Sequence, residues 1–431
     1  FPPAETREGY FEAMKQAIAK YGIPLGIYSD RHTIFRSPKE TLTVEQELAG
    51  EVVPLSQFGK VMADLNITHI KAMSPQAKGR IERLWGTFQD RLVIELRLLN
   101  VDTMEEANRV LPNLIEKHKD TVMAGRTHGQ QALPITFGYK VAVWLDEINR
   151  SSHRLTEMKN RLLVGQFSGA VGTLASITEN GLELQEEIMK ELDLGLPNIS
   201  WHASRDNLAE FASFIGILGS TLGKIANEIY LLQKTEFNEL EEPFKMGKVG
   251  SSTMPHKRNP SKVQNIVTVS RILRQSIPIF LEGMIHHHER DMISWQTELE
   301  SLPEICLLIS QMTSSSVVVL EGLNVNVDRM RRNLDLTNGL IISESVMIKL
   351  GEKIGRQTSH DVVYEASMKA YEENTPLLDA LLENDDVMQH ITQEELRNLF
   401  QVEKYVGYSV AYAERVVQKT KEAFSLTAVV N

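Results

Sequence analysis

Residues 250–260 place hydroxyl, cationic and amide side chains within one short segment of the chain. A glycine at its start permits backbone angles that are closed to other residues, and two prolines stiffen the rest of the segment. We therefore expect a loop of constrained shape, able to close over a substrate, that carries Ser251, Ser252, Lys257 and Asn259. Gly-Ser-Ser alone is more often a surface turn, so the prediction depends on the whole string, Gly-Ser-Ser-Thr-Met-Pro-His-Lys-Arg-Asn-Pro.

His128 is a second candidate for chemistry, because an imidazole can move a proton near neutral pH. Thr127 and Gln130 flank it and could hold the ring and a substrate carboxylate. By itself, a histidine after Gly-Arg-Thr is more often a capped loop residue. In a chain that also contains the 250–260 loop, the proton-transfer role is favoured.

Long helices are the elements that must position these residues. From about Lys117 onward, hydrophobic residues recur three or four apart, most clearly from Arg205 to Leu240. Three glycines in that stretch are spaced to form one small-residue edge where a second helix can approach closely. They are Gly216, Gly219 and Gly223. We expect a bundle of long helices.

The pattern before Lys117 is mixed α/β. Short strand-like runs lie at residues 24–28 and 67–72, and a helix with one apolar face is predicted from Ser74 through Leu92.

The composition excludes several classes of protein. A chain of 431 residues, 42% hydrophobic and 24% charged, is globular and long enough for two or three domains. Its net charge of -11 argues against general binding to nucleic acid or anionic membranes. The single Cys306 forms no intrachain disulfide, and no run approaches the ~20 apolar residues of a membrane span. With no signal-like N-terminal pattern, a cytoplasmic location without membrane contact is expected.

The 250–260 string resembles the signature loop of the fumarase/aspartase superfamily, which includes adenylosuccinate lyase, argininosuccinate lyase and 3-carboxy-cis,cis-muconate cycloisomerase. Residues 121–138, 201–206, 231–236 and 288–291 resemble further superfamily strings, so the resemblance covers nearly everything after His118. It implies a mainly α fold, in which a long-helix bundle is followed by a small C-terminal helical domain. It also implies a homotetramer whose active sites are each assembled from three subunits.

The resemblance implies a reaction through a carbanion beside a carboxylate, on a small di- or tricarboxylate and without a cofactor. Ser251 would be the catalytic base at that carbon. His128 would act from the opposite side, as proton donor or carboxylate ligand. The implied substrate-binding residues are Thr127, Gln130, Arg205, Ser252, Lys257 and Asn259.

The choice of family member rests on other positions. Gln264 stands where adenylosuccinate lyases carry a glutamate that pairs with the catalytic histidine, and an amide cannot raise the basicity of His128 as a carboxylate would. Residues 295–304 and 329–337 look most like bacterial 3-carboxy-cis,cis-muconate cycloisomerase, which is our first choice. An adenylosuccinate lyase-like C–N lyase is the alternative, and residues 339–407 resemble a domain that both enzymes share.

Residues 22–32 and 74–85 resemble the core of an integrase-type insertion-sequence transposase of RNase H-like fold. Asp30 and Glu82 would match the second and third acids of its metal-binding triad, with the first acid lacking a counterpart. Without the family resemblance, the two residues would be a strand-end acid and a solvated helix residue. An inactive transposase fragment or fusion is therefore the hypothesis of another class, and DNA is a partner only if this fragment functions.

We therefore expect three parts: a truncated α/β RNase H-like fragment at 1–115, a central bundle at 116–337 and a C-terminal helical domain at 338–431. The superfamily's Ser/Thr-rich first region has no counterpart before His118, so an impaired enzyme is expected. Consecutive helical residues point ~100° apart, so at most two of the histidines at 286–288 could share a metal ion. No metal is expected in the lyase-like part.

Overall fold

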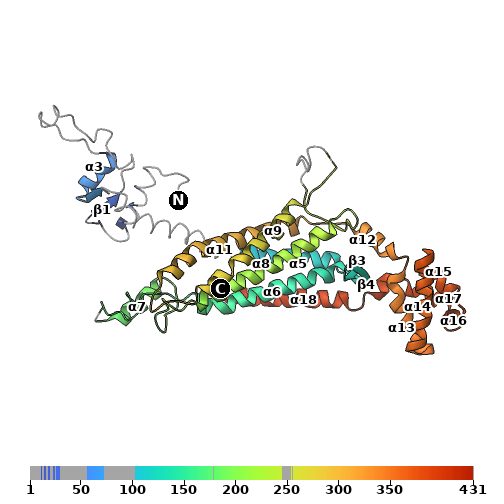
Figure 1. The fold of residues 1–431 in the computed structure, drawn as a ribbon. Helices are drawn as coiled ribbons and strands as arrows, with labels where there is room; N and C mark the ends of the chain where they lie inside the picture. Colours follow the sequence, from blue (N-terminus) through green and yellow to red (C-terminus); the bar gives the residue numbers. More distant parts are fainter. Residues whose placement is uncertain are drawn as a thin grey trace. The chain divides into compact units, whose positions relative to one another are not determined.

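The computed structural model describes residues 11, 14–15, 18–19, 23–24, 26–29, 56–71, 102–177, 179–244, 254 and 256–430. The chain divides into two compact units, residues 1–93 and residues 94–431, which Figure 1 traces in sequence colours. Each unit has its own hydrophobic core.

The first unit contains a parallel strand pair and a short helix. The two strand-like runs are confirmed as strands β1 (Gly26–Ser29) and β2 (Thr68–Lys71), and the structure pairs them in parallel. Helix α3 (Gln57–Asp64) begins where the Ser56 hydroxyl accepts a hydrogen bond from the backbone N–H of Gly59, at 3.0 Å. Phe58, Met62 and Ile67 form its small core. The described residues of the first unit do not establish an RNase H-like fold, so that fold stays a prediction.

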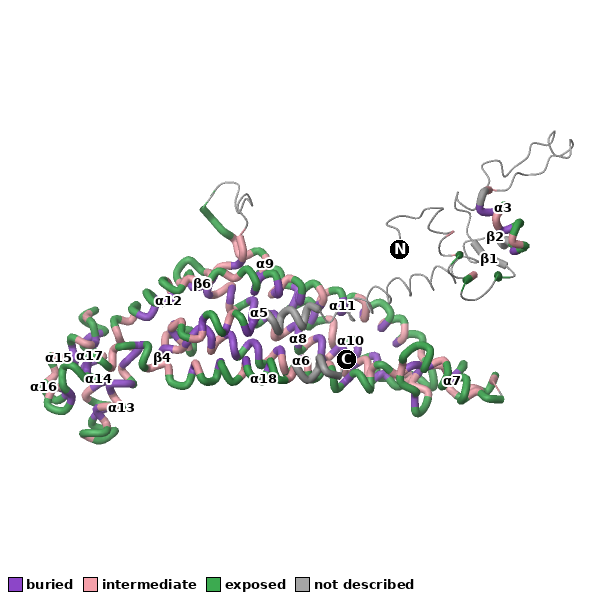
Figure 2. The backbone as a smooth tube through the Cα atoms, turned by 180° about the vertical axis from the view of Figure 1, so that it is seen from behind, coloured by how far each residue is buried: buried purple, intermediate pink, exposed green. Residues whose placement is uncertain are grey.

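The second unit is a bundle of long helices with shorter elements at its ends (Figure 1). The bundle consists of α5 (Asp102–His118), α6 (Phe137–Leu162), α8 (Asp206–Leu232), α9 (Ser261–Ser276), α11 (Met292–Glu321) and α18 (Ser409–Val430). The short helices α7 (Gly181–Glu191) and α10 (Pro278–Glu282) lie between these in sequence. Figure 2 shows buried and exposed positions alternating along the bundle helices, as expected for amphipathic helices.

Helix α8 confirms the periodicity from Arg205 onward, because nearly all the hydrophobic residues that define it are buried. The expected extension to Leu240 is wrong, since the helix ends at Leu232. Asn238 adopts a left-handed conformation (φ 49°), which asparagine tolerates better than most residues. The chain then folds back, and the N–H of Glu239 donates to the carbonyl of Leu232 at 2.8 Å.

The predicted small-residue edge of α8 is confirmed, and α9 is the helix that packs on it. A Cβ atom on Gly216 would lie 3.0 Å from Ile277, just beyond the end of α9. Cβ atoms on Gly219 and Gly223 would collide with Leu273 and Ser270. The glycines therefore allow close helix packing, which compensates for their cost of roughly 1 kcal/mol each in a helix interior.

Helices α8 and α11 are long and apolar enough to cross a membrane, judged by length and composition alone. Within the structure, 61% of the most apolar window of α8 and 44% of that of α11 are buried. The two helices pack against each other and against α9. Their apolar character is accounted for by the bundle core.

A β-hairpin connects the bundle to the smaller helical part at one end. Strands β3 (Val122–Thr127) and β4 (Gln130–Thr136) pair antiparallel, and the side chain of Ala124 belongs to the core of the C-terminal helices. Strand β5 (Leu240–Glu241) follows α8, strand β6 (Asn324–Val325) precedes α12, and the two strands pair antiparallel. The remaining elements are α12 (Val327–Leu334), η1 (Asp335–Thr337), η2 (Leu340–Ile342), α13 (Ser343–Ile354), α14 (Arg356–Glu373), α15 (Leu377–Leu382), α16 (Asp385–Met388), α17 (Gln393–Leu399) and η3 (Val402–Tyr405).

We predict that Gly138→Ala destabilises the protein, because a Cβ atom there would lie 2.6 Å from the backbone Cα of Lys119. Overpacking of this kind costs about 1–3 kcal/mol, more than alanine gains in helix propensity. Gly181→Ala is the matched control, since its Cβ would only make ordinary contacts from 3.6 Å. Thermal unfolding should show a lower midpoint for Gly138→Ala alone, and equal midpoints would contradict the packing argument.

Candidate active site

His128 lies at the tip of the β3–β4 hairpin. Thr127 pairs with Gln130, so His128 and Gly129 form a two-residue turn with φ angles of 52° and 77°. Two left-handed central residues define the type I′ turn, whose twist suits a tight hairpin. The left-handed conformation is strained for a histidine. The hairpin thus brings three predicted site residues, Thr127, His128 and Gln130, together at one exposed tip.

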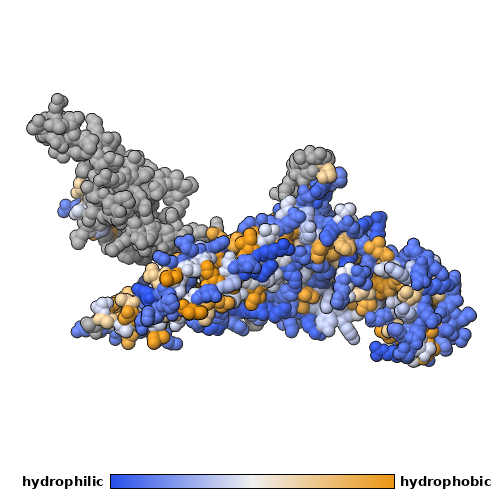
Figure 3. Space-filling model, viewed as in Figure 1, coloured by the Kyte–Doolittle hydropathy of each residue, from blue (hydrophilic) through white to orange (hydrophobic). Residues whose placement is uncertain are grey.

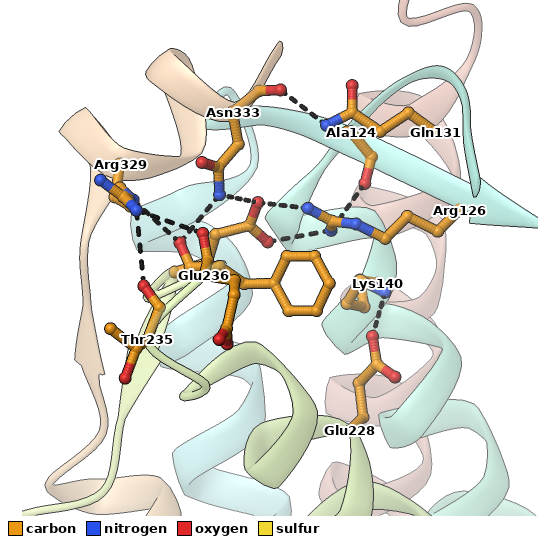
Figure 4. A network of polar contacts seen from close by, with 11 residues as sticks. Ala124, Arg126, Gln131, Lys140, Glu228, Thr235, Glu236, Arg329 and Asn333 are labelled. Carbon is orange, nitrogen blue, oxygen red and sulfur yellow. Dashed lines mark hydrogen bonds and ion pairs between the residues drawn. The ribbon is translucent and has the colours of Figure 1, made fainter. Parts of the chain in front are cut away.

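A buried carboxylate holds β3 of this hairpin through Arg126, the residue before Thr127 (Figure 4). Glu239 is 0% exposed, and its two oxygens accept hydrogen bonds from the Arg126 guanidinium at 2.6 and 3.0 Å. Asn333 donates its side-chain N–H to the same carboxylate at 2.7 Å. The Arg126 guanidinium also lies over the ring of Phe237, 4.9 Å from its centre. A buried charge with this many partners is fixed in position.

Further hydrogen bonds join the hairpin and α12 to the segment that follows α8. Gln131, on β4, donates to the carbonyl of Asn333 at 2.6 Å. Arg329, on α12, donates to the carbonyls of Phe237 and Glu236, both at 3.1 Å (Figure 4). Three elements distant in sequence therefore meet around Glu239.

The 250–260 loop is described only in part. Ser251 and Ser252 lie outside the described residues, Lys257 is exposed, and Asn259 is half-buried. The base of the loop is held closed by Glu242, whose carboxylate accepts from the N–H groups of Lys262 and Val263 at the start of α9. These contacts satisfy helix N–H groups that have no partner within α9.

An ion pair adds to this closure. Arg258 donates to both carboxylate oxygens of Glu241, at 3.0 and 3.2 Å, and lies over the ring of Phe244. The C-terminal end of the loop is therefore anchored to the segment that follows α8.

Arg205 lies in a different environment, at the start of α8. Its side chain forms a buried ion pair with Glu298 and lies over the rings of Trp201 and Trp295. His202 is buried beside it and contacts the Arg290 guanidinium at 2.7 Å. Burial, followed by the nearby charges of Arg290 and Arg205, lowers the pKa of His202.

The two groups of predicted residues lie at opposite ends of α8. Arg205 immediately precedes that helix, whereas Glu239, the partner of the hairpin, follows it. A helix of 27 residues is about 40 Å long at 1.5 Å per residue. One chain therefore does not bring Arg205 and His128 into contact with one small substrate.

The histidines at 286–288 correct one expectation. They lie in the connection between α10 and α11, not on a helix, and His288 is left-handed (φ 54°). No group of three or more potential metal ligands occurs among the described residues.

Asp30 and Glu82, the predicted transposase acids, lie outside the described residues, as does the helix predicted from Ser74.

Cys306 is buried in the bundle core. Burial raises the pKa of Cys306 to about 12, which makes this thiol a poor nucleophile.

Comparison with known proteins identifies the family. Residues 89–273 match a family model described as lyase, and residues 339–416 match the adenylosuccinate lyase C-terminus. The chain is 45% identical to an N-acetyl-S-(2-succino)cysteine lyase of Dickeya dadantii, over 72% of this chain and 68% of that protein. The chain belongs to the fumarase/aspartase superfamily.

Two further superfamily members are similar to the chain. An adenylosuccinate lyase of Archaeoglobus fulgidus is 40% identical over 76% of this chain and 74% of its own. The crystal structure of a 3-carboxy-cis,cis-muconate lactonizing enzyme from Pseudomonas putida matches with a TM-score of 0.72, at 35% identity over 77% of this chain and 74% of that one. The lyase match begins at residue 89, so it extends into the segment predicted to be transposase-like.

Sequence reasoning missed Arg126, Glu239 and Asn333. Arg126 and Asn333 lie within strings that resemble the superfamily, but neither had been assigned a role. Glu239 belongs to the acidic run Asn-Glu-Leu-Glu-Glu at 238–242, which looks like a solvated surface. The available signal was its position beside Leu240, an apolar residue that is buried in the bundle core.

We predict that His202 makes stability depend on pH. Its pKa is lowered in the folded protein, so below its ordinary value of about 6.5 the unfolded chain binds the extra proton more readily. Stability should therefore be full above pH 7 and fall as the pH drops through 6.5. His202→Gln, which retains an acceptor for Arg290, should show a smaller drop in melting temperature between pH 8 and 5.5. Identical drops in both proteins would refute this assignment.

Proposed function

We propose that the protein is a lyase that cleaves the carbon–sulfur bond of N-acetyl-S-(2-succino)cysteine or a close analogue. The observation that carries this proposal is the 45% identity to the lyase of that name, over 308 residues. That value exceeds the 40% identity to the adenylosuccinate lyase. The substrates of these lyases all carry carboxylates. The proposed reaction therefore differs from that of an adenylosuccinate lyase in the leaving group, which is a thiol and not an amine.

The reaction removes a proton and a thiolate from adjacent carbons of the succinyl group. The base takes the proton from the methylene carbon, leaving an electron pair that the neighbouring carboxylate stabilises. That pair forms the new C=C bond, the C–S bond breaks, and its electrons leave with sulfur as a thiol once a proton is supplied. The products are an unsaturated four-carbon dicarboxylate and N-acetylcysteine.

We assign Ser251 as the base and His128 as the group on the opposite side. A serine hydroxyl ionises only with help, so backbone N–H groups and a nearby cation such as Lys257 must stabilise its oxyanion. Asn259 and Ser252 would orient the substrate carboxylate. The hairpin supports the role of His128, since the Arg126–Glu239 pair below it keeps the tip in one place.

Gln264 supports a leaving group other than the amine of adenylosuccinate. It lies in the first turn of α9, directly after the anchored end of the 250–260 loop. An amide cannot raise the basicity of His128 as a glutamate would. A thiol is a much better leaving group than an amine and needs less help from an acid.

We also propose that the active site is shared between subunits of a homotetramer. Arg205 can serve the same site as His128 only if the two residues come from different chains, because α8 separates them within one chain. Large hydrophobic side chains are exposed on the bundle, and Figure 3 shows them gathered along α11 and its neighbours. They include Ile217, Ile272, Ile285, Ile293 and Leu307. An exposed apolar area of this kind fits an interface between copies.

A second candidate is a 3-carboxy-cis,cis-muconate cycloisomerase, our first choice from the sequence. The strings at 295–304 and 329–337 favour it, and so does the structural match to the Pseudomonas putida enzyme. There the departing group would be an internal carboxylate, and the reverse step would close a lactone. The same base and the same hairpin would serve both reactions.

We predict that the protein releases thiol from N-acetyl-S-(2-succino)cysteine, detected with a thiol reagent, as ultraviolet absorbance of the unsaturated dicarboxylate rises in equal amount. Adenylosuccinate and 3-carboxy-cis,cis-muconate are the competing substrates. Preference for either by kcat/KM would overturn the leaving-group proposal. No turnover of any of the three would overturn the proposed function.

His128→Ala and Ser251→Ala should each lower kcat about 10²–10⁴-fold, the usual range for a lost proton-transfer group. His153→Ala is the matched control, because His153 is an exposed histidine on α6. Wild-type kcat in Ser251→Ala would show that another group is the base.

A further inference from the structure

The Arg126–Glu239–Asn333 cluster takes no direct part in the proposed chemistry, yet the carboxylate of Glu239 is fully buried. Glu239 receives hydrogen bonds from the hairpin through Arg126 and from α12 through Asn333. It does not reach the exposed hairpin tip itself. Any influence on the reaction must therefore pass through the elements that it joins.

Both strands of the hairpin contact elements of the C-terminal part of the chain. Strand β3 packs on α12, and β4 contacts η2 and η3. Ala124, at the centre of β3, is 0% exposed and lies in the same core as Leu350 and Leu381. The hairpin thus lies between the bundle and the C-terminal helices, and Glu239 is the charged contact common to both sides.

We propose that Glu239 is a positioning residue for the lyase reaction, acting through Arg126 to hold the strained His128 turn at a fixed place. Asn333 links the same carboxylate to α12, so the C-terminal helices also help to set the position of the turn. This proposal rests on the proposed function, because it gives Glu239 a task in that reaction.

The energetics favour a tightly defined geometry. All three hydrogen bonds to the carboxylate are charge-assisted, and the two from Arg126 approach it as a pair from one guanidinium. Glu239→Gln would replace an acceptor by a donor and leave the half-buried Arg126 without its counter-ion. The hairpin would then lose its fixed anchor, although its backbone ladder would remain.

The first test compares Glu239→Gln with the wild type in turnover of N-acetyl-S-(2-succino)cysteine. We expect kcat to fall about 10- to 100-fold with KM changed less than threefold, because displaced catalytic groups slow chemistry more than binding. Glu383→Gln is the matched control, since it breaks an exposed ion pair with Lys369 in the C-terminal helices. Unchanged kcat in Glu239→Gln would overturn the proposal.

A double variant separates positioning from stability. Arg126→Met with Glu239→Gln removes both buried charges, so the melting temperature should return toward the wild-type value. The anchor is still absent, so kcat should stay as low as in Glu239→Gln alone. Recovery of both quantities together would show that Glu239 only balances charge, which would contradict the proposal.

Amide hydrogen exchange tests the same idea without any substrate. In Glu239→Gln the amides of β3 and β4 should exchange at least about tenfold faster, while those of α8 keep their wild-type rates. Unchanged hairpin exchange would overturn the proposal even if the enzyme is active. Faster exchange in a protein that turns over no substrate would instead contradict the proposed function and leave the anchoring role standing.

Discussion

The buried carboxylate of Glu239 is the interaction on which the arrangement of the candidate site depends. It lies just beyond α8, where the chain leaves the bundle core, and it binds Arg126 of the hairpin and Asn333 of α12. A charge excluded from water must keep its partners or lose several kcal/mol. The bundle, the hairpin and the C-terminal helices are thereby held in one relative arrangement.

The long helices impose a second constraint on function. Glycines on α8 let α9 pack closely, and the resulting rigid bundle separates Arg205 from the hairpin by the whole length of α8. The C-terminal end of the 250–260 loop is held by Glu241 and Glu242, near the hairpin end of the same helix. One chain cannot bring all of these residues to one substrate, which is why we propose a site shared between chains.

The sequence predicted what depends on local pattern. Hydrophobic periodicity located α8, glycine spacing predicted close approach of a second helix, and short apolar runs located β1 and β2. Motif resemblance led to the superfamily, which the comparisons confirm. The sequence could not reveal that Glu239 is buried or that Glu239 pairs with Arg126, because the two residues lie 113 positions apart and meet only in the folded chain. The end of α8 was missed for a related reason, since the segment after it is held by Arg329 and Asn333, which lie much further along the chain.

In the proposed reaction, groups fixed in the protein transfer the proton on one face of the substrate, through a carbanion. The most direct measurement runs the reaction in reverse, with fumarate and N-acetylcysteine in D2O, and locates deuterium in the adduct by proton NMR. The account predicts one deuterium, at a single one of the two methylene positions. Deuterium spread equally over both positions, at a rate no faster than without protein, would contradict it.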